Sequence, residues 1–335
     1  MSEPVRVLSA LPLPETTQQA LRAVDARVRV RVLSREARRR FRRAAGGDDA
    51  AAAEIREALS ESAALFTLGF DHSWLPEEGP LRWIQLASAG ADHAISRPLP
   101  GGVVLTNAGD LYATPVAEWV LAFLLMHAKQ MPFFLARQAE AVWSRKDRLG
   151  TLRGATVVVV GMGAIGGETA RLCQAFGARV LGSTRRARAG GRAPHCDQLF
   201  GPDQLHAMVA QGDYVVLAVP LTETTRGFFD AAALAAMKPE GVLVNVARGS
   251  VVDQAALVEA LREKRIAAAY TDVVVPEPLP DGDALWSTPN LHITPHNSGV
   301  FNEWVAEAGT VLEANLRRFV AGEALAHVVD LERGY

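Results

Sequence analysis

Cysteine is scarce in this chain, and the two residues present, Cys173 and Cys196, show neither metal-ligand spacing nor the pattern of a disulfide framework. We therefore predict no metal site and no disulfide-stabilised fold, and we expect the protein to work in a reducing cytoplasm. No charged and then apolar leader opens the sequence, so secretion is not expected. The most apolar stretch, 116–126, is shorter than the ~20 residues of a membrane span and predicts a buried helix, not a membrane partner.

A strong charge of one sign is also missing, because 35 basic and 37 acidic residues give a formal net charge of −2. No global field would attract nucleic acid or an anionic membrane. Six arginines crowd the segment 35–43, but no aromatic or glycine-rich platform lies between them. We interpret this segment as a solvated helix face and expect no nucleic-acid partner.

The pattern of apolar residues indicates two domains, for which 335 residues with 49% hydrophobic content are sufficient. In the first hundred residues, short β-rich runs alternate with helical patterns, which predicts a parallel sheet covered by helices. A long apolar helix, predicted over 115–131, then leads to a second series of about six strands that begins at 155–160. A final helix, 302–320, has no strand after it, so we expect the tail to pack on the first domain.

A Gly-x-Gly-x-x-Gly turn, formed by Gly161, Gly163 and Gly166, follows a run of valines and opens a predicted helix. In this context the glycines permit a tight turn, close approach of the backbone to a pyrophosphate, and close packing of helix on strand. The helix N-terminus offers amide donors and the positive end of the dipole to phosphate. The turn therefore predicts a dinucleotide site.

The end of the next predicted strand bears on the choice of dinucleotide. Thr184 stands where a carboxylate would bind the ribose 2′-hydroxyl of NAD, and Arg185 and Arg186 follow it. Arginine offers charge-assisted contacts to a 2′-phosphate. We therefore expect NADP(H) to be the preferred cofactor, with NAD(H) as the alternative; a generic basic loop is the competing interpretation.

Three side chains of complementary chemistry, Arg248, Glu277 and His296, each follow a predicted strand downstream of the turn. A guanidinium can bind a carboxylate and polarise a carbonyl, and an imidazole titrates near neutrality and can donate a proton. A carboxylate bonded to the imidazole would favour its protonated form. Singly, the three could be a strand-end cap, a solvated loop residue and a turn histidine. Because all three follow a dinucleotide-binding turn in the sequence, together they predict reduction of a 2-oxo acid.

Eight short motifs occur in a fixed order over nearly the whole chain: 89–92, 116–118, 152–154, 161–166, 219–225, 245–249, Asp272 with 277–280, and 294–296. Together they resemble the motifs of the D-isomer-specific 2-hydroxyacid dehydrogenases. The resemblance implies that Arg248 binds and polarises the substrate, that His296 is the general acid/base, and that Glu277 is its partner.

The resemblance also implies further contacts. Backbone amides around Ser88, Ala89 and Gly90 would hold the substrate carboxylate, and Asp272 would face the nicotinamide amide. The residues implied beside the cofactor are Val116, Ala164, Ile165, Val219, Pro220, Thr225, Val246, Ala247, Asp272 and Gly299. A homodimer formed through the long helix near Val116 is implied as well.

The chain departs from the family pattern in two places. Val274 and Val275 stand where an aromatic residue and an acid are frequent, and Asn297 and Ser298 replace a common Ile-Ala pair. The first change would alter packing beside Glu277, and the second would alter polarity near the nicotinamide. Related formate dehydrogenases carry glutamine at the position of Glu277, so the carboxylate argues against formate as substrate.

The fold class that follows is α/β, with two doubly wound parallel-sheet domains. A Rossmann-type dinucleotide-binding domain, 106–297, would be inserted in a flavodoxin-like substrate-binding domain made of 1–105 and 298–335. We expect an NADPH-preferring reductase that converts a small 2-oxo acid, glyoxylate or hydroxypyruvate, to a D-2-hydroxy acid. The competing hypothesis is a dinucleotide-sensing interaction protein, like the corepressors built on this fold, because fold alone does not define function.

Overall fold

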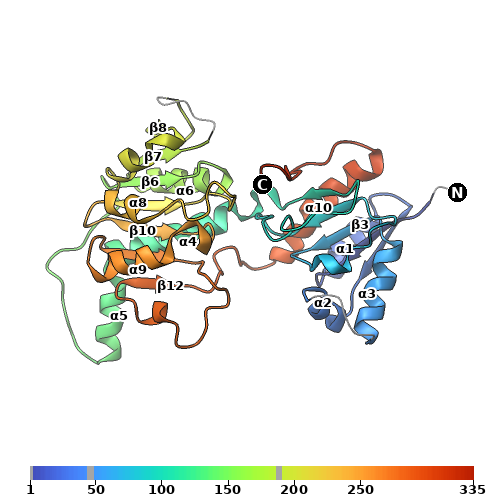
Figure 1. The fold of residues 1–335 in the computed structure, drawn as a ribbon, viewed down its shortest axis with the longest axis horizontal. Coiled ribbons are helices and arrows are strands. Elements are labelled where there is room, and N and C mark those ends of the chain that lie inside the picture. The colour runs from blue at the N-terminus through green and yellow to red at the C-terminus, as the bar shows by residue number, and fades with distance from the viewer. Residues whose placement is uncertain (1–2, 44–48, 186–190) are drawn as a thin grey trace. The chain divides into compact units, whose positions relative to one another are not determined.

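Two compact units make up the chain, each built on its own parallel sheet (Figure 1). The structure, a computed structural model, describes residues 3–43, 49–185 and 191–335. Unit 1 comprises Met1–Leu111 and Phe301–Tyr335, and unit 2 comprises Tyr112–Val300. The sequence places the corresponding boundaries at 105/106 and 297/298. Unit 2 is thus a continuous segment inserted in a discontinuous unit 1.

The sheet of unit 1 has the strand order β2-β1-β3-β4-β5, which is the flavodoxin-like order. Its strands are β1 (Val5–Ser9), β2 (Val28–Val32), β3 (Ala64–Thr67), β4 (Trp83–Leu86) and β5 (Val104–Thr106). Helices α2 (Arg35–Phe41) and α3 (Ala50–Glu61) pack on one face, and α1 (Glu15–Arg22) and α10 (Trp304–Ala321) pack on the other. Neighbouring strand residues alternate between these cores, as Val7 and Leu8 do, so both faces are covered.

The C-terminal helix α10 is tied to the sheet of unit 1 by a buried polar network. Asn315, 1% exposed, donates from Nδ2 to Gln85 Oε1 at 2.9 Å and to Ala326 O at 3.0 Å, and its Oδ1 accepts from Ala326 N at 2.8 Å. Thr106 Oγ1 donates to the same Gln85 oxygen at 2.8 Å. Because buried polar groups need partners, this network fixes one register for the tail, which packs on unit 1 as the sequence predicts.

The sheet of unit 2 has seven parallel strands in the order β12-β11-β10-β9-β6-β7-β8. This is the Rossmann order with one further strand at the β12 edge. The strands are β6 (Thr156–Val160), β7 (Arg179–Ser183), β8 (Gln198–Phe200), β9 (Tyr214–Leu217), β10 (Val242–Asn245), β11 (Ala268–Thr271) and β12 (Leu291–Ile293). The sequence predicts six of them and misses β8, a three-residue strand at one edge of the sheet.

Helices cover both faces of this sheet too, so the predicted doubly wound class is confirmed. Val157 and Val159 of β6 pack with α4 (Ala113–Ala128) and α6 (Ala164–Ala175). Val158 and Val160 face a second core that includes α7 (Leu205–Val209), α8 (Ala231–Ala236) and α9 (Gln254–Arg262). The remaining helices are α5 (Met131–Ala139) and the short 3₁₀ segments η1 (His72–Trp74), η2 (Gly109–Tyr112), η3 (Pro202–Gln204), η4 (Gly249–Val251) and η5 (Ala284–Ser287).

The long apolar helix differs from its prediction in bounds and in burial. It ends at Ala128, and Gln130, with a φ of 53°, separates it from α5, because left-handed backbone does not continue a helix. Only one face is buried, through residues such as Val120 and Leu124. Over the described parts of the chain, one helical stretch, Gly109–Ala128, is long and apolar enough to cross a membrane, judged by length and composition alone.

Candidate active site

The site residues predicted in unit 2 collect at one edge of its sheet, because the carboxyl ends of parallel strands all lie at the same edge. The glycine turn follows β6, and Thr184 follows β7. Val219 lies just beyond β9 and Arg248 just beyond β10. Asp272 directly follows β11, and the loop after β12 carries His296.

The glycine turn has the geometry that a dinucleotide requires. Gly161 has a φ of 103°, and a Cβ there would lie 2.6 Å from Ala218 O. A Cβ on Gly166 would lie 1.9 Å from Gly161 O, so the start of α6 can pack this closely only with glycine. A Cβ on Gly163 would meet nothing within 4 Å, and Gly163 is the N-cap of the twelve-residue helix α6. An open backbone surface at a helix N-terminus fits a pyrophosphate.

The residues at the end of β7 lie where the adenosine ribose would be recognised. Thr184 is half-buried and directly follows the strand, and Arg185 is exposed. Arg186 lies outside the described residues.

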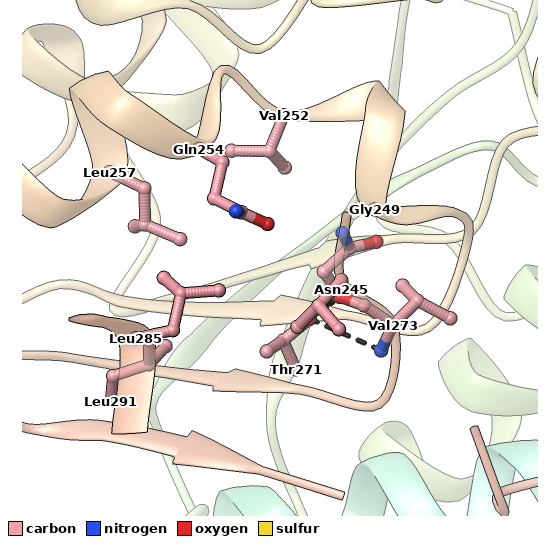
Figure 2. Close-up of a pocket in the computed structure, with 10 residues that line it drawn as sticks. Asn245, Gly249, Val252, Gln254, Leu257, Thr271, Val273, Leu285 and Leu291 are labelled. Atoms are coloured by element: carbon pink, nitrogen blue, oxygen red, sulfur yellow. Dashed lines mark hydrogen bonds between the residues drawn. The ribbon is translucent and has the colours of Figure 1, made fainter. Parts of the chain in front are cut away.

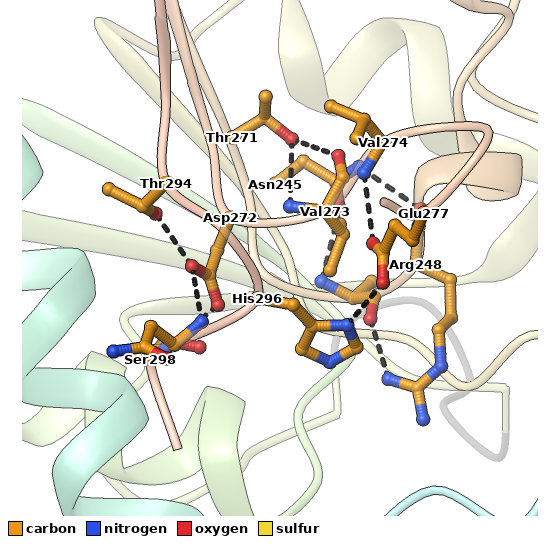
Figure 3. Close-up of polar contacts among 12 residues, drawn as sticks. Asn245, Arg248, Thr271, Asp272, Val273, Val274, Glu277, Thr294, His296 and Ser298 are labelled. Atoms are coloured by element: carbon orange, nitrogen blue, oxygen red, sulfur yellow. Dashed lines mark hydrogen bonds and ion pairs between the residues drawn. The ribbon is translucent and has the colours of Figure 1, made fainter. Parts of the chain in front are cut away.

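His296 and Glu277 form a hydrogen-bonded pair, drawn in Figure 3. The distance from His296 Nδ1 to Glu277 Oε2 is 2.7 Å, and Val274 N donates to the other carboxylate oxygen, Oε1, at 3.1 Å. Both carboxylate oxygens are therefore bound, which orients the carboxylate toward the ring. Because Nδ1 is occupied, Nε2 is the nitrogen left to exchange a proton with a substrate.

The pair shifts the pKa of both members. The hydrogen bond to Glu277 raises the pKa of His296 above its ordinary value, with the charges of Glu277 and Asp272 adding to the rise; burial and the nearby Arg248 act in the opposite direction. Burial alone would raise the pKa of Glu277, but bonds from His296 and the Val274 amide, with the charges of His296 and Arg248, leave it lowered. The arrangement therefore favours an imidazolium beside a carboxylate.

Arg248 belongs to the same electrostatic cluster, since its charge acts on both members of the pair. It follows β10, and its Nη1 donates to Ala247 O at 2.8 Å. Asn245 holds the backbone of this segment: its Nδ2 donates to Arg248 O at 3.1 Å, and its Oδ1 accepts from Ala247 N at 3.0 Å. No local pattern in the sequence indicates this role of Asn245, although an amide side chain at a strand end can make both bonds.

Asp272 organises the loop that carries His296. Its side chain is 1% exposed and accepts from Thr294 Oγ1 at 2.6 Å, Asn297 N at 2.9 Å and Ser298 N at 2.8 Å. The His296 amide donates to the Asp272 backbone carbonyl at 2.7 Å. The loop therefore closes around one carboxylate. The bonds from residues 297 and 298 come from backbone amides, so the departure from the family pattern at Asn297 and Ser298 leaves them in place; Ser298 is 5% exposed.

The loop expected to bind the substrate carboxylate belongs to unit 1, whereas Arg248, Glu277 and His296, here called the triad, belong to unit 2. Ser88, Ala89 and Gly90 follow β4. Ser88 Oγ donates to Gly90 O at 2.8 Å, and Asn107 Nδ2 donates to Ala89 O at 3.0 Å. These bonds give the loop a defined conformation within its own unit.

The other residues implied beside the cofactor all lie in unit 2. Thr225 folds its loop back, because its Oγ1 donates to Pro220 O at 2.7 Å and accepts from Thr222 N at 2.8 Å. Gly299 approaches Tyr112 so closely that a Cβ would lie 3.0 Å from the ring. Buried members of the set are Val116, Val246 and Ala247, and more exposed members are Ala164, Ile165, Val219 and Pro220.

A cavity of about 470 Å³ adjoins the acid/base pair. Asp272, Glu277 and His296 line it together with mainly apolar side chains, among them Leu279 and Trp286. Few polar groups converging on an apolar cavity are typical of small-molecule sites. Among the residues that the structure describes, no cluster of three or more His, Cys, Asp or Glu side chains could hold a metal ion.

Residues 121–298 match the model of the D-isomer specific 2-hydroxyacid dehydrogenase, NAD binding domain. This match covers more than half of the chain, so the protein belongs to that family of oxidoreductases. The resemblance and the fold class predicted from the sequence are thereby confirmed.

Similar proteins carry several enzyme names. The chain is 32% identical to a protein of Pectobacterium atrosepticum named glyoxylate/hydroxypyruvate reductase B, over 68% of this chain and 72% of that one. The chain is also 31% identical to a D-3-phosphoglycerate dehydrogenase of Methanocaldococcus jannaschii over 75% of its length. The matched region spans about half (48%) of that longer protein.

A solved structure of NADPH-dependent glyoxylate/hydroxypyruvate reductase from Sinorhizobium meliloti, in complex with NADP and sulfate, superposes with a TM-score of 0.81. Its sequence identity is 26%, with 99% of this chain and all of that one covered.

We predict that Glu277→Gln lowers the pKa of His296 toward its ordinary value, because the amide keeps a hydrogen-bond partner but removes the negative charge. The imidazolium would then lose its proton at lower pH than in the unchanged protein. Titration of the His296 Cε1–H signal by NMR measures the midpoint, with the exposed Glu240→Gln as control. Equal midpoints in Glu277→Gln and the parent would contradict the role given to the carboxylate.

The raised pKa of His296 in the unchanged protein also predicts how the free energy of unfolding depends on pH. A raised folded-state pKa stabilises the fold below the ordinary histidine pKa, and this contribution is lost as the pH rises through the folded value. Since the His296 side chain is 46% exposed, solvent screens the interaction and the effect on unfolding is small.

Proposed function

We propose that the protein is an NADPH-preferring reductase that transfers hydride to a small 2-oxo acid and forms a D-2-hydroxy acid. The observation that carries this proposal is the His296–Glu277 pair beside Arg248, at the same sheet edge as the dinucleotide turn. Glyoxylate and hydroxypyruvate are the proposed substrates, supported by the names of relatives from Pectobacterium atrosepticum and Sinorhizobium meliloti.

Bound NAD(P)H supplies the hydride that C2 of the substrate accepts. The Arg248 guanidinium binds the substrate by hydrogen bonds and draws electron density from the carbonyl oxygen. His296 delivers its Nε2 proton to that oxygen as the C–H bond forms, and Glu277 stabilises the imidazolium before the transfer. Oxidation of the hydroxy acid would run the same steps backward, with neutral His296 as the base.

Each unit has a separate task in this proposal. Unit 2 binds the dinucleotide through the turn 161–166 and the residues implied beside it. Unit 1 supplies the amides of Ser88, Ala89 and Gly90 to the substrate carboxylate.

Replacing Arg248 or His296 with alanine is expected to reduce kcat/KM for 2-oxo acid reduction by roughly 100-fold or more, because polarisation or protonation of the carbonyl is lost. NADPH oxidation against a panel of small 2-oxo acids measures this, and the dissociation constant of NADPH serves as the control for an intact cofactor site. Turnover by the parent on no member of the panel, or full turnover by both variants, would contradict the proposal.

The cofactor preference is tested at the end of β7. Arg185→Ala is expected to lower kcat/KM with NADPH by about tenfold, the equivalent of one charge-assisted hydrogen bond, while leaving kcat/KM with NADH nearly unchanged. Arg179→Ala, an exposed arginine at the start of the same strand, is the matched control. A parent enzyme that uses NADH as well as NADPH would reject the preference.

We also propose that the protein is a homodimer. The segment 131–149 supports this, because it exposes several large apolar side chains, with Trp143 89% exposed and Leu135 53% exposed. Exposed apolar patches mark interaction surfaces. Light scattering is expected to give twice the chain mass of 35.9 kDa, and a mass of one chain at micromolar concentration would contradict this.

A further inference from the structure

One side chain outside the triad, Gln254, bonds both backbone groups of a single residue in the loop that carries Glu277. Gln254 Nε2 donates to Val275 O at 2.8 Å, and Val275 N donates to Gln254 Oε1 at 3.0 Å. Gln254 is the first residue of α9, so the contact joins a helix N-terminus to the loop after β11. The chemistry of the pair defines the amide orientation, since a backbone N–H can only donate and a carbonyl can only accept.

Packing alone does not hold this loop. Residues 275–278 are exposed, and the side chain of Val275 is 43% exposed. Glu277 nevertheless has to keep its carboxylate 2.7 Å from His296 Nδ1. In an exposed segment, hydrogen bonds to the backbone are the means of holding one conformation, because apolar contacts that would restrict the chain are few.

A second contact acts at the neighbouring residue. Gly249 lies against Val274, where a Cβ would come within 2.4 Å of the Val274 carbonyl carbon. Gly249 and Gln254 both belong to the segment after β10, and Gly249 directly follows Arg248. Figure 2 shows both residues on the lining of a small cavity that also includes Val273. The segment that presents the guanidinium is therefore joined to the loop that presents the carboxylate.

We propose that Gln254 is a positioning residue, whose amide holds the backbone at Val275 so that Glu277 stays within hydrogen-bond reach of His296. The chain of contacts runs from Gln254 to Val275, through the adjacent Val274 amide to Glu277 Oε1, and from Glu277 Oε2 to the imidazole. Gln254 touches neither substrate nor cofactor in this proposal. Its effect on turnover rests on the proposed function, but its effect on His296 does not.

The test measures His296 directly in the full-length protein without substrate. The charged groups that act on this imidazole are Glu277, Arg248 and Asp272, and all three remain in the variants. In Gln254→Ala the NMR titration midpoint of His296 is expected to fall by about half a pKa unit, since Glu277 leaves the ring part of the time. The signal is assigned by its loss in His296→Gln.

Two further variants make the test specific. Gln254→Met keeps about the same length of side chain and adds no charge, but it makes neither of the two bonds to the Val275 backbone, so its midpoint is expected to fall as well. Gln211→Ala is the matched control, because Gln211 also bonds one backbone carbonyl of unit 2, Ala207 O at 3.0 Å, away from the triad. Its midpoint is expected to equal that of the parent. Thermal melts confirm that each variant is folded.

The outcomes separate this inference from the proposed function. A lowered midpoint in both Gln254 variants, with kcat reduced about tenfold and NADPH affinity unchanged within about twofold, supports it, because partial loss of a general acid lowers the chemical step. An unchanged midpoint in the folded variants overturns it, whatever the turnover. A lowered midpoint in a protein that reduces no 2-oxo acid leaves the positioning role in place and removes the proposed function alone.

Discussion

The hydrogen bond between His296 Nδ1 and the Glu277 carboxylate is the interaction on which the proposed chemistry depends. It fixes which ring nitrogen faces a substrate and keeps the proton on the imidazole at higher pH. Both residues lie on exposed loops, where a pair of charged groups is worth little unless its geometry is held. Much of the polar structure at this sheet edge therefore serves to hold loop backbone.

Backbone is held on each side of the pair by a different polar side chain. Asp272 gathers Thr294 and the amides of the His296 loop around a buried carboxylate. Asn245 binds the segment that carries Arg248 by both ends of its amide. The three loops follow the neighbouring strands β10, β11 and β12, so the parallel sheet sets their spacing and these bonds set their conformations.

Most of the strands and helices could be predicted from sequence, because they depend on local signals. The valines of β6 and the glycines that follow predict a strand, a turn and a helix, and the structure has them. The sequence implies only a contact of Asp272 to the nicotinamide, whereas the Asp272 carboxylate binds groups more than twenty positions away. The same holds for Gln254 and Val275, whose separation of 21 positions gives no periodic signal. Contacts between separate loops are set by tertiary structure, which one sequence does not reveal.

The exposure of the acid/base loops follows from their task. A residue that donates a proton to a substrate has to meet it, so burying His296 and Glu277 more deeply would close the site and, for Glu277, favour the neutral acid. Fixing them through bonds of Asp272 and Gln254 to the loop backbone avoids both effects, because these bonds do not involve the imidazole ring. A site built this way combines an accessible acid with a defined geometry, and catalysis by positioned groups requires both.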